Sequence, residues 1–298
     1  MVETIQARGR ATSDIQTDAE EDLKADINIC GVIEYDKKSV LTDKFTELAE
    51  AGFNKIGIRV TTENYECLDE LLGNTDEISN IRNVAENYRL AIDSVSIEDD
   101  VLNKRRENMD GTFEDLQPYI DFASKIGSNV LNIVNHKDRD LSGSLPEYLY
   151  DAIRTGLAQL EEKVIDKDLR IAIENNSELP ATANDCNAVL LGTNPEKIGI
   201  CFDPVNYVKA IGRKPETDST KIIRELGERI FHVCFRQMPL KVRNEERLVN
   251  YNSVVRALKK QGYEGAISID VDKASRTIGM DLERIAKYLN SKFGGQRG

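Results

Sequence analysis

The segment IFHVCFRQM, residues 230–238, mixes apolar side chains with residue types that bind metal ions and anions. Side chains along a β-strand point alternately to its two faces, so a strand over this segment has a polar and an apolar face. The polar face carries Ile230, His232, Cys234 and Arg236, and the apolar face carries Phe231, Val233 and Phe235. Imidazole and thiolate groups bind metal ions, and a guanidinium binds carboxylate or phosphate through paired hydrogen bonds. The polar face is therefore either part of a functional site or a partly wetted surface.

Three carboxylates each follow a short apolar run elsewhere in the chain. Glu174 follows Ile-Ala-Ile, Asp203 follows Ile-Cys-Phe, and Asp270 follows Ile-Ser-Ile. Each carboxylate by itself is also explained as a cap for the next helix. Three carboxylates that converge repel each other unless a cation or shared protons compensate. A divalent metal ion is the natural compensation, because carboxylates are suitable ligands for such ions.

These residues lie at the ends of a regular series of predicted strands. The strands are short runs rich in Ile and Val, as buried parallel strands are. They cover residues 27–32, 55–60, 91–97, 129–135, 170–175, 198–203, 230–235 and 265–271. Helical patterns lie between them, for example over residues 40–53 and over residues 144–164, where Ser144 and Glu147 form a capping-box pattern.

Eight strands that alternate with helices predict an α/β fold with a parallel sheet, of the size of a closed (β/α)8 TIM barrel. An open, doubly wound sheet is the competing fold, but no strand is followed by a glycine-rich phosphate loop. In a barrel, functional groups lie where strands end. The polar residues at the predicted strand ends are Arg59, Glu98, His136, Glu174, Asp203, Arg236 and Asp270. The strand starts carry fewer charges, with Lys55 and Arg170 at the very beginning of two strands.

The composition limits the partners and the compartment. A net charge of -12 argues against a nucleic acid or an anionic membrane as partner. There is neither an apolar run of about 18 residues nor a secretory signal, and the five cysteines form no CxxC pair. We therefore expect reduced thiols and a cytoplasmic protein. Residues 1–25 are expected to form a flexible polar arm, or a segment that docks on a neighbouring subunit of a homo-oligomer, and residues 26–298 a single barrel domain.

The second half of the chain resembles the sugar isomerase/epimerase superfamily of xylose-isomerase-like TIM barrels. The resemblance is carried by the blocks RIAIENN, IGICFDPVN, IFHVCFRQ and GYEGAISID, within residues 170–272. In that family the fifth strand ends in Glu-Asn, and the sixth ends in Asp, with Asn or His three residues later. The seventh strand carries His-x-His, and the eighth ends in Glu. The Glu, the Asp, the second His and the last Glu hold one divalent metal ion, and the two glutamates move the proton.

The resemblance implies roles for individual residues. Glu174 and Asp203 take the first two ligand positions, Cys234 falls on the ligand histidine, and Asp270 falls on the last glutamate. The implied metal ligands are therefore Glu174, Asp203, Cys234 and Asp270, and the implied catalytic residues are Glu174 and Asp270. The ion would be Mn, Mg, Co or Zn, and a thiolate ligand would favour the softer of these ions. Two of the four ligand positions depart from the family pattern.

Candidate substrate-binding residues lie around the same predicted mouth. They are His232, Arg236, Asn206, His136 and Arg59. Asn206 occupies the Asn-or-His position after Asp203, whereas His232 is equally explained as a core histidine and Arg236 as the partner of a neighbouring acid.

The resemblance implies a metal-assisted isomerase or epimerase that acts on a small sugar, polyol or hydroxy-keto acid through an enediolate. A dehydratase of the same family is an alternative, because it shares the first half of that chemistry. The other alternative is a metal-free relative that binds a sugar-like ligand or acts as a subunit. DNA repair is disfavoured, because two histidines cannot build a histidine-rich metal site of the kind that repair relatives use.

Overall fold

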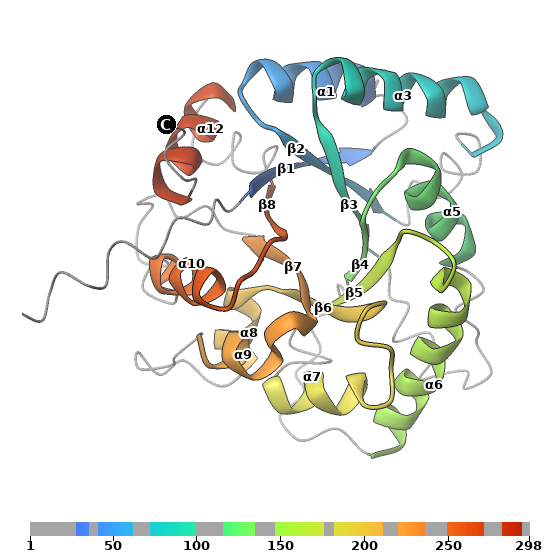
Figure 1. The fold of residues 1–298 in the computed structure, drawn as a ribbon, viewed down its shortest axis with the longest axis vertical. Coiled ribbons are helices and arrows are strands. Elements are labelled where there is room, and N and C mark those ends of the chain that lie inside the picture. The colour runs from blue at the N-terminus through green and yellow to red at the C-terminus, as the bar shows by residue number, and fades with distance from the viewer. Residues whose placement is uncertain are drawn as a thin grey trace, which may run out of the picture.

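The chain folds into a closed ring of eight parallel strands (Figure 1). The computed structural model describes residues 28–35, 41–61, 72–98, 116–134, 147–175, 182–210, 220–235, 249–270 and 282–293. The strands are β1 (Asn28–Tyr35), β2 (Lys55–Thr61), β3 (Ala91–Glu98), β4 (Val130–Val134), β5 (Arg170–Glu174), β6 (Ile198–Phe202), β7 (Ile230–Phe235) and β8 (Ala266–Asp270). Each strand pairs with the next in the sequence, and β1 pairs in parallel with β8. That last pairing closes the sheet and excludes the open doubly wound alternative.

Helices surround the strand ring (Figure 1). They are α1 (Leu41–Glu50), α3 (Thr75–Asn87), α5 (Gln117–Ile126), α6 (Glu147–Val164), α7 (Ala183–Leu190), α8 (Pro204–Ala210), α9 (Thr220–Leu226), the short 3-10 helix η3 (Gly227–Arg229), α10 (Tyr251–Lys260) and α12 (Leu282–Phe293). The predicted (β/α)8 TIM barrel is confirmed. The predicted arm, residues 1–25, lies outside the described residues, and the domain boundary at residue 26 stays a prediction.

Each strand has one face that packs against the helices and one face that points into the barrel. On β2, Ile56, Ile58 and Val60 are fully buried in the main core cluster, which also contains residues of the surrounding helices. A smaller cluster of Val130, Ala172, Cys201 and Phe231 comes from the inward faces of β4, β5, β6 and β7. Fully burying one such aliphatic or aromatic side chain contributes about 1.5–3 kcal/mol. The layer between strands and helices therefore contains the main apolar core, whereas the inner face combines a small apolar cluster with buried polar residues such as Asp93 and His232.

The predicted faces of β7 are wrong at two residues. Ile230 belongs to the main core cluster on the helix side, and Phe231 belongs to the inner cluster. The cause is a register shift between β6 and β7, where Ile200 pairs with Ile230 but Cys201 pairs with His232. The extra residue on β7 breaks the strict alternation of side chains. Beyond the irregularity, Val233 and Phe235 pack towards the helices, as predicted.

Gly199 of β6 makes room for this irregularity. A Cβ atom at this position would lie 2.6 Å from the Arg229 carbonyl oxygen and 2.6 Å from the Phe231 ring. Both distances are shorter than van der Waals contact. The glycine therefore lets Phe231 turn into the barrel beside β6.

Replacing this glycine tests the local packing. We expect Gly199→Ala to destabilise the protein by about 1–3 kcal/mol, because a methyl group overpacks the contact with Phe231 and the Arg229 backbone. Gly73→Ala is the control, since nothing lies within 4 Å of a Cβ atom at that position. Urea unfolding of both variants beside the wild type measures the difference. Equal stability of Gly199→Ala and the wild type would contradict the packing described for β6 and β7.

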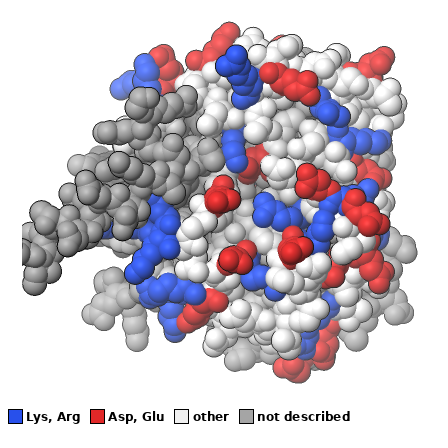
Figure 2. Space-filling model, in the orientation of Figure 1, with Lys and Arg blue, Asp and Glu red and all other residues white. Residues whose placement is uncertain are grey.

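Positive and negative side chains are interspersed on the surface drawn in Figure 2. On the face drawn in Figure 2, the coloured Lys and Arg side chains alternate with Asp and Glu side chains and form no large patch of one sign. Among the helices of the described ranges, none has the length and apolar character needed to cross a membrane.

Candidate active site

Two buried carboxylates lie at the ends of the neighbouring strands β5 and β6. Glu174 is the last residue of β5 and is 2% exposed, and Asp203 directly follows β6 and is fully buried. The Asn206 amide Nδ2 donates a hydrogen bond to Glu174 Oε1 at 3.0 Å. Asn206, predicted to bind substrate, therefore contacts a candidate catalytic carboxylate from the first turn of α8.

Backbone hydrogen bonds fix Asp203. Its Oδ1 atom accepts from the backbone N–H groups of Val205, at 2.7 Å, and of Asn206, at 3.2 Å. The carboxylate thus caps the start of α8, where negative charge is favoured by the exposed N–H groups. The alternative explanation of Asp203 as a helix cap is correct for this oxygen. The same two bonds fix the carboxylate at the end of the barrel.

Asn175 ties the ends of β5 and β6 together. Its Oδ1 accepts from the Asp203 backbone N–H at 2.6 Å, and its Nδ2 donates to the Asp203 carbonyl oxygen at 3.0 Å. The Asn175 side chain is fully buried. The Glu-Asn pair at the end of β5 thereby supplies one carboxylate and the amide that positions the next strand end.

Tyr251, at the start of α10, is a further residue near these groups, and sequence reasoning missed it. Burial is the main cause that raises the pKa of its phenol, and the nearby Asp203 and Cys234 raise this pKa further. The neutral O–H form is therefore strongly favoured. The ring packs edge-on against Phe235, with centroids 4.5 Å apart. Its buried hydroxyl forms no hydrogen bond within the described part of the chain. A neutral phenol in this place can donate a hydrogen bond to a ligand.

The predicted metal ligands are only partly brought together. Within the described ranges, no three His, Cys, Asp or Glu side chains lie close enough to hold one metal ion. Glu174, Asp203 and Cys234 all have described side chains, and Cys234 is half-buried against the inner cluster. Asp270 pairs with Val32 at the end of β8, but its side chain lies outside what is described. Among the described side chains, Glu174 and Asp203 are therefore the two candidate ligands at the mouth. Carboxylates suit a divalent ion, but two of them do not make a complete coordination site.

The other predicted binding residues divide into three cases. The Arg59 guanidinium is held by Glu98, with Nε 2.9 Å from Oε1, at the ends of β2 and β3. His136 and Arg236 lie outside the described residues. His232 is 1% exposed inside the barrel. Its role in substrate binding, like that of Arg59, stays a prediction.

His232 belongs to a buried charged group below the mouth. Its Nδ1 atom lies 3.3 Å from Asp93 Oδ2, and the Lys55 ammonium lies 2.9 Å from Asp93 Oδ1. Burial raises the pKa of the Asp93 carboxyl, but the nearby His232 imidazole and then Lys55 outweigh burial and lower the pKa to about 2. Asp93 lies early in β3, so an inspection of strand ends does not single it out.

The lowered pKa predicts a specific pH dependence of stability. A carboxyl with a folded-state pKa below its ordinary value of 3.8 stabilises the fold above that pH, and the stabilisation disappears as the pH falls towards about 2. A shift of this size corresponds to about 2 kcal/mol. We expect Asp93→Asn to be less stable than the wild type at pH 7, with a gap that narrows between pH 4 and pH 2.

Denaturant unfolding across this pH range measures the gap. Asp166→Asn, at an exposed carboxylate in the turn after α6, is the control and should show no such narrowing. A gap between Asp93→Asn and wild type that stays constant with pH would contradict the described ion pairs.

Comparison with known proteins identifies the family. The family model described as xylose isomerase-like TIM barrel matches residues 45–289, whereas curated protein sequences give no significant match. A xylose isomerase domain protein from Planctomyces limnophilus has 12% identity, covers 90% of this chain and 99% of its own, and gives a TM-score of 0.60. A sugar phosphate isomerase/epimerase from Parabacteroides distasonis has 14% identity, with coverages of 94% and 97% and a TM-score of 0.60. The IolI protein with a bound zinc atom has 14% identity, coverages of 90% and 99% and a TM-score of 0.59. The fold and the resemblance drawn from the second half of the sequence are thereby confirmed, and the chain belongs to the xylose isomerase-like TIM barrel family.

Proposed function

We propose that the protein isomerises or epimerises a small sugar, polyol or hydroxy-keto acid by moving a proton at the carbon next to a carbonyl group. The observation that carries this proposal is the pair of buried carboxylates, Glu174 and Asp203, fixed at the ends of adjacent strands. The family contains isomerases and epimerases, and the barrel fold has its active site at this end. The net charge of -12 favours a small-molecule substrate over a nucleic acid or an anionic membrane as partner. The proposed cytoplasmic location rests on the cysteine pattern instead.

Glu174 is the proposed base. Its carboxylate takes the proton from the carbon next to the carbonyl, which leaves an enediolate. In an epimerisation, Asp270 in its protonated form returns a proton to the same carbon, on the same face or the opposite face. In an isomerisation, the former carbonyl carbon is protonated and a hydroxyl proton moves to the other oxygen. The Asn206 amide, 3.0 Å from Glu174 Oε1, orients the base. The neutral Tyr251 hydroxyl is a candidate hydrogen-bond donor to a substrate oxygen, because the phenol lies near Asp203 and Cys234.

A divalent metal ion is the proposed cofactor, with Glu174, Asp203 and Asp270 as its ligands. When bound, such an ion polarises the carbonyl group and stabilises negative charge on the neighbouring oxygens. The zinc atom of the structurally similar IolI protein supports metal use in this fold. We leave Cys234 out of the proposed ligand set, because it forms no metal-holding group with Glu174 and Asp203 among the described side chains.

One observation favours the metal-free alternative. Cys234 occupies the position of the family's ligand histidine and does not group with the two carboxylates. A ligand-binding relative without turnover would retain the mouth and lose the ion.

A dehydratase shares the proton abstraction by Glu174 and differs only in the fate of the enediolate.

Loss of the proposed base should abolish proton transfer. We expect the wild type to catalyse deuterium uptake from heavy water into at least one substrate in a panel of ketoses and inososes, followed by NMR. Glu174→Gln should slow this exchange by about 10²–10⁴-fold, because an amide cannot accept the proton. Glu162→Gln, at an exposed position of α6, should exchange at the wild-type rate. Equal rates in Glu174→Gln and the wild type would remove Glu174 from the chemistry.

Metal content separates the proposed ligand set from its alternatives. We expect protein purified without chelator to contain a divalent metal, Asp203→Asn to lose most of it, and Cys234→Ala to retain it, because only carboxylates are proposed as ligands. Elemental analysis of the three proteins prepared in parallel measures this. Loss of the metal in Cys234→Ala would restore the thiolate as a ligand. A wild type without metal would favour the metal-free relative.

A further inference from the structure

A pocket opens at the end of the barrel opposite to Glu174 and Asp203. It has a volume of about 510 Å³, and its walls include the first residues of β2, β4, β5 and β7 together with the segment that precedes β8. Small-molecule sites are typically clefts of about 300–1,000 Å³. The pocket is therefore large enough for a small organic ligand, at an end of the barrel that the proposed reaction does not use.

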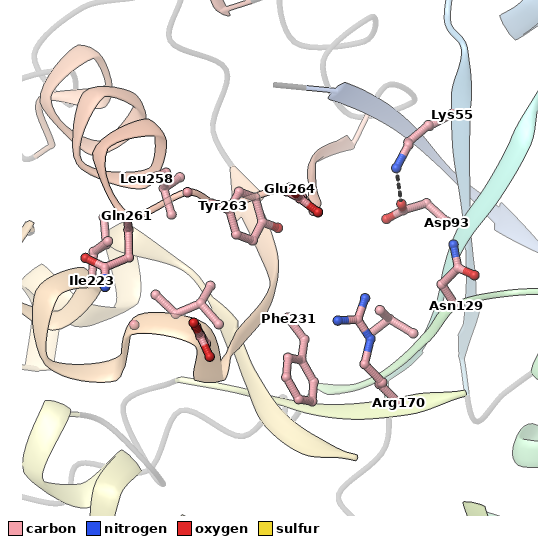
Figure 3. A pocket seen from close by; sticks show the side chains of 16 residues that line it. Lys55, Asp93, Asn129, Arg170, Ile223, Phe231, Leu258, Gln261, Tyr263 and Glu264 are labelled. Atoms are coloured by element: carbon pink, nitrogen blue, oxygen red, sulfur yellow. Dashed lines mark hydrogen bonds and ion pairs between the residues drawn. The ribbon is translucent and has the colours of Figure 1, made fainter. Parts of the chain in front are cut away.

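Arg170, the first residue of β5, is the main cation of this pocket. Its guanidinium carbon lies 4.8 Å from the centre of the Phe231 ring. Figure 3 shows the guanidinium extending into the pocket beside Phe231. Arg170 forms no ion pair with any residue in the described ranges, whereas the neighbouring Lys55 is neutralised by Asp93 at 2.9 Å.

The Phe231 ring restricts the Arg170 side chain. A guanidinium that lies over an aromatic ring gains a cation–π contact and loses part of its conformational freedom. Phe231 is itself held in place by its tight packing on Gly199. A carboxylate matches the two parallel N–H donors of a guanidinium edge.

The other charged side chains of the pocket favour a singly charged anion over a doubly charged one. Lys55 and Asp93 offset one another, and the exposed carboxylates Glu228 and Glu264 belong to the lining. With Lys55 and Arg170 against Asp93, Glu228 and Glu264, the lining carries a formal net charge of -1. It therefore repels a phosphate dianion more strongly than a carboxylate, whose binding depends on local contact with the Arg170 guanidinium. The Asn129 amide, also in the lining, adds a hydrogen-bonding group for an uncharged polar part of the ligand.

We propose that this pocket is a second small-molecule site, which takes a small polar monocarboxylate with its carboxylate on the Arg170 guanidinium. The Glu228 and Glu264 carboxylates then face the hydroxyl or amino groups of the ligand. The site is independent of the proposed isomerase chemistry, because none of the residues proposed for that chemistry lines it.

The test observes Arg170 directly with lactate as the probe. The full chain is labelled with 15N-arginine, and the Nε–H signal of Arg170 is identified as the one missing from Arg170→Lys. We expect lactate to shift this signal saturably, with a dissociation constant of about 1–10 mM for one charge-assisted contact. Lactamide, the uncharged analogue of the same shape, should leave the signal in place. Arg82, exposed on α3, provides the control signal.

The same titration on Glu174→Gln separates this site from the mouth. An unchanged lactate response of Arg170 in Glu174→Gln supports an independent site at the opposite end of the barrel. The proposal is overturned if lactate does not shift the Arg170 signal, if lactamide shifts it equally, or if Arg82 responds in the same way. Because no outcome depends on turnover, failure of the proposed isomerase function leaves the result of this test intact.

Discussion

The parallel pairing of β1 with β8 closes the sheet and determines which side chains face the interior. Once β1 pairs with β8, every strand has one face towards the helices and one towards a narrow interior with little room for water. The helix-facing residues are almost all Ile, Val and Phe, which concentrates the apolar stabilisation outside the ring. The buried polar side chains of the strands, such as Asp93 and His232, therefore face the interior, where each ionised group needs a partner.

The buried acids illustrate how this requirement is met at two levels of the barrel. Near the strand starts, Asp93 forms an ion pair with Lys55 and lies 3.3 Å from the His232 imidazole. At the strand ends, Asp203 is stabilised by the N–H groups at the start of α8, and Glu174 by the Asn206 amide. Neutral N–H donors thus hold both carboxylates in place at the mouth. That arrangement suits groups that must bind a cation or accept a proton.

The sequence predicts the barrel well, because alternating apolar runs and helical patterns reflect local physics. β5 and β7 begin where their Ile-rich runs begin, and the strand-end carboxylates Glu174 and Asp203 do lie at one end of the barrel. The inner face of β7 could not be predicted fully, because the register shift at Phe231 depends on Gly199 of a different strand. The expected alternation of side chains between the two faces of a strand holds only where the pairing with the neighbouring strand contains no extra residue.

Other features depend on contacts between segments distant in the sequence. Asp93 gains its importance from His232, four strands further round the barrel, and Tyr251 reaches Asp203 from the start of a helix. Neither residue lies at a strand end, so neither follows the rule that finds Glu174. The Arg170 pocket requires the stacking of one strand start on another, which only the folded chain shows.

Crystals grown with Mn²⁺ and measured at the manganese absorption edge show where the ion binds without assumptions about substrate, because the anomalous signal locates it. If Glu174 and Asp203 hold the ion, a peak lies at the mouth, about 2.0–2.6 Å from their carboxylate oxygens. A well-ordered mouth without such a peak, or a peak at a different set of residues, would contradict metal binding by these two carboxylates.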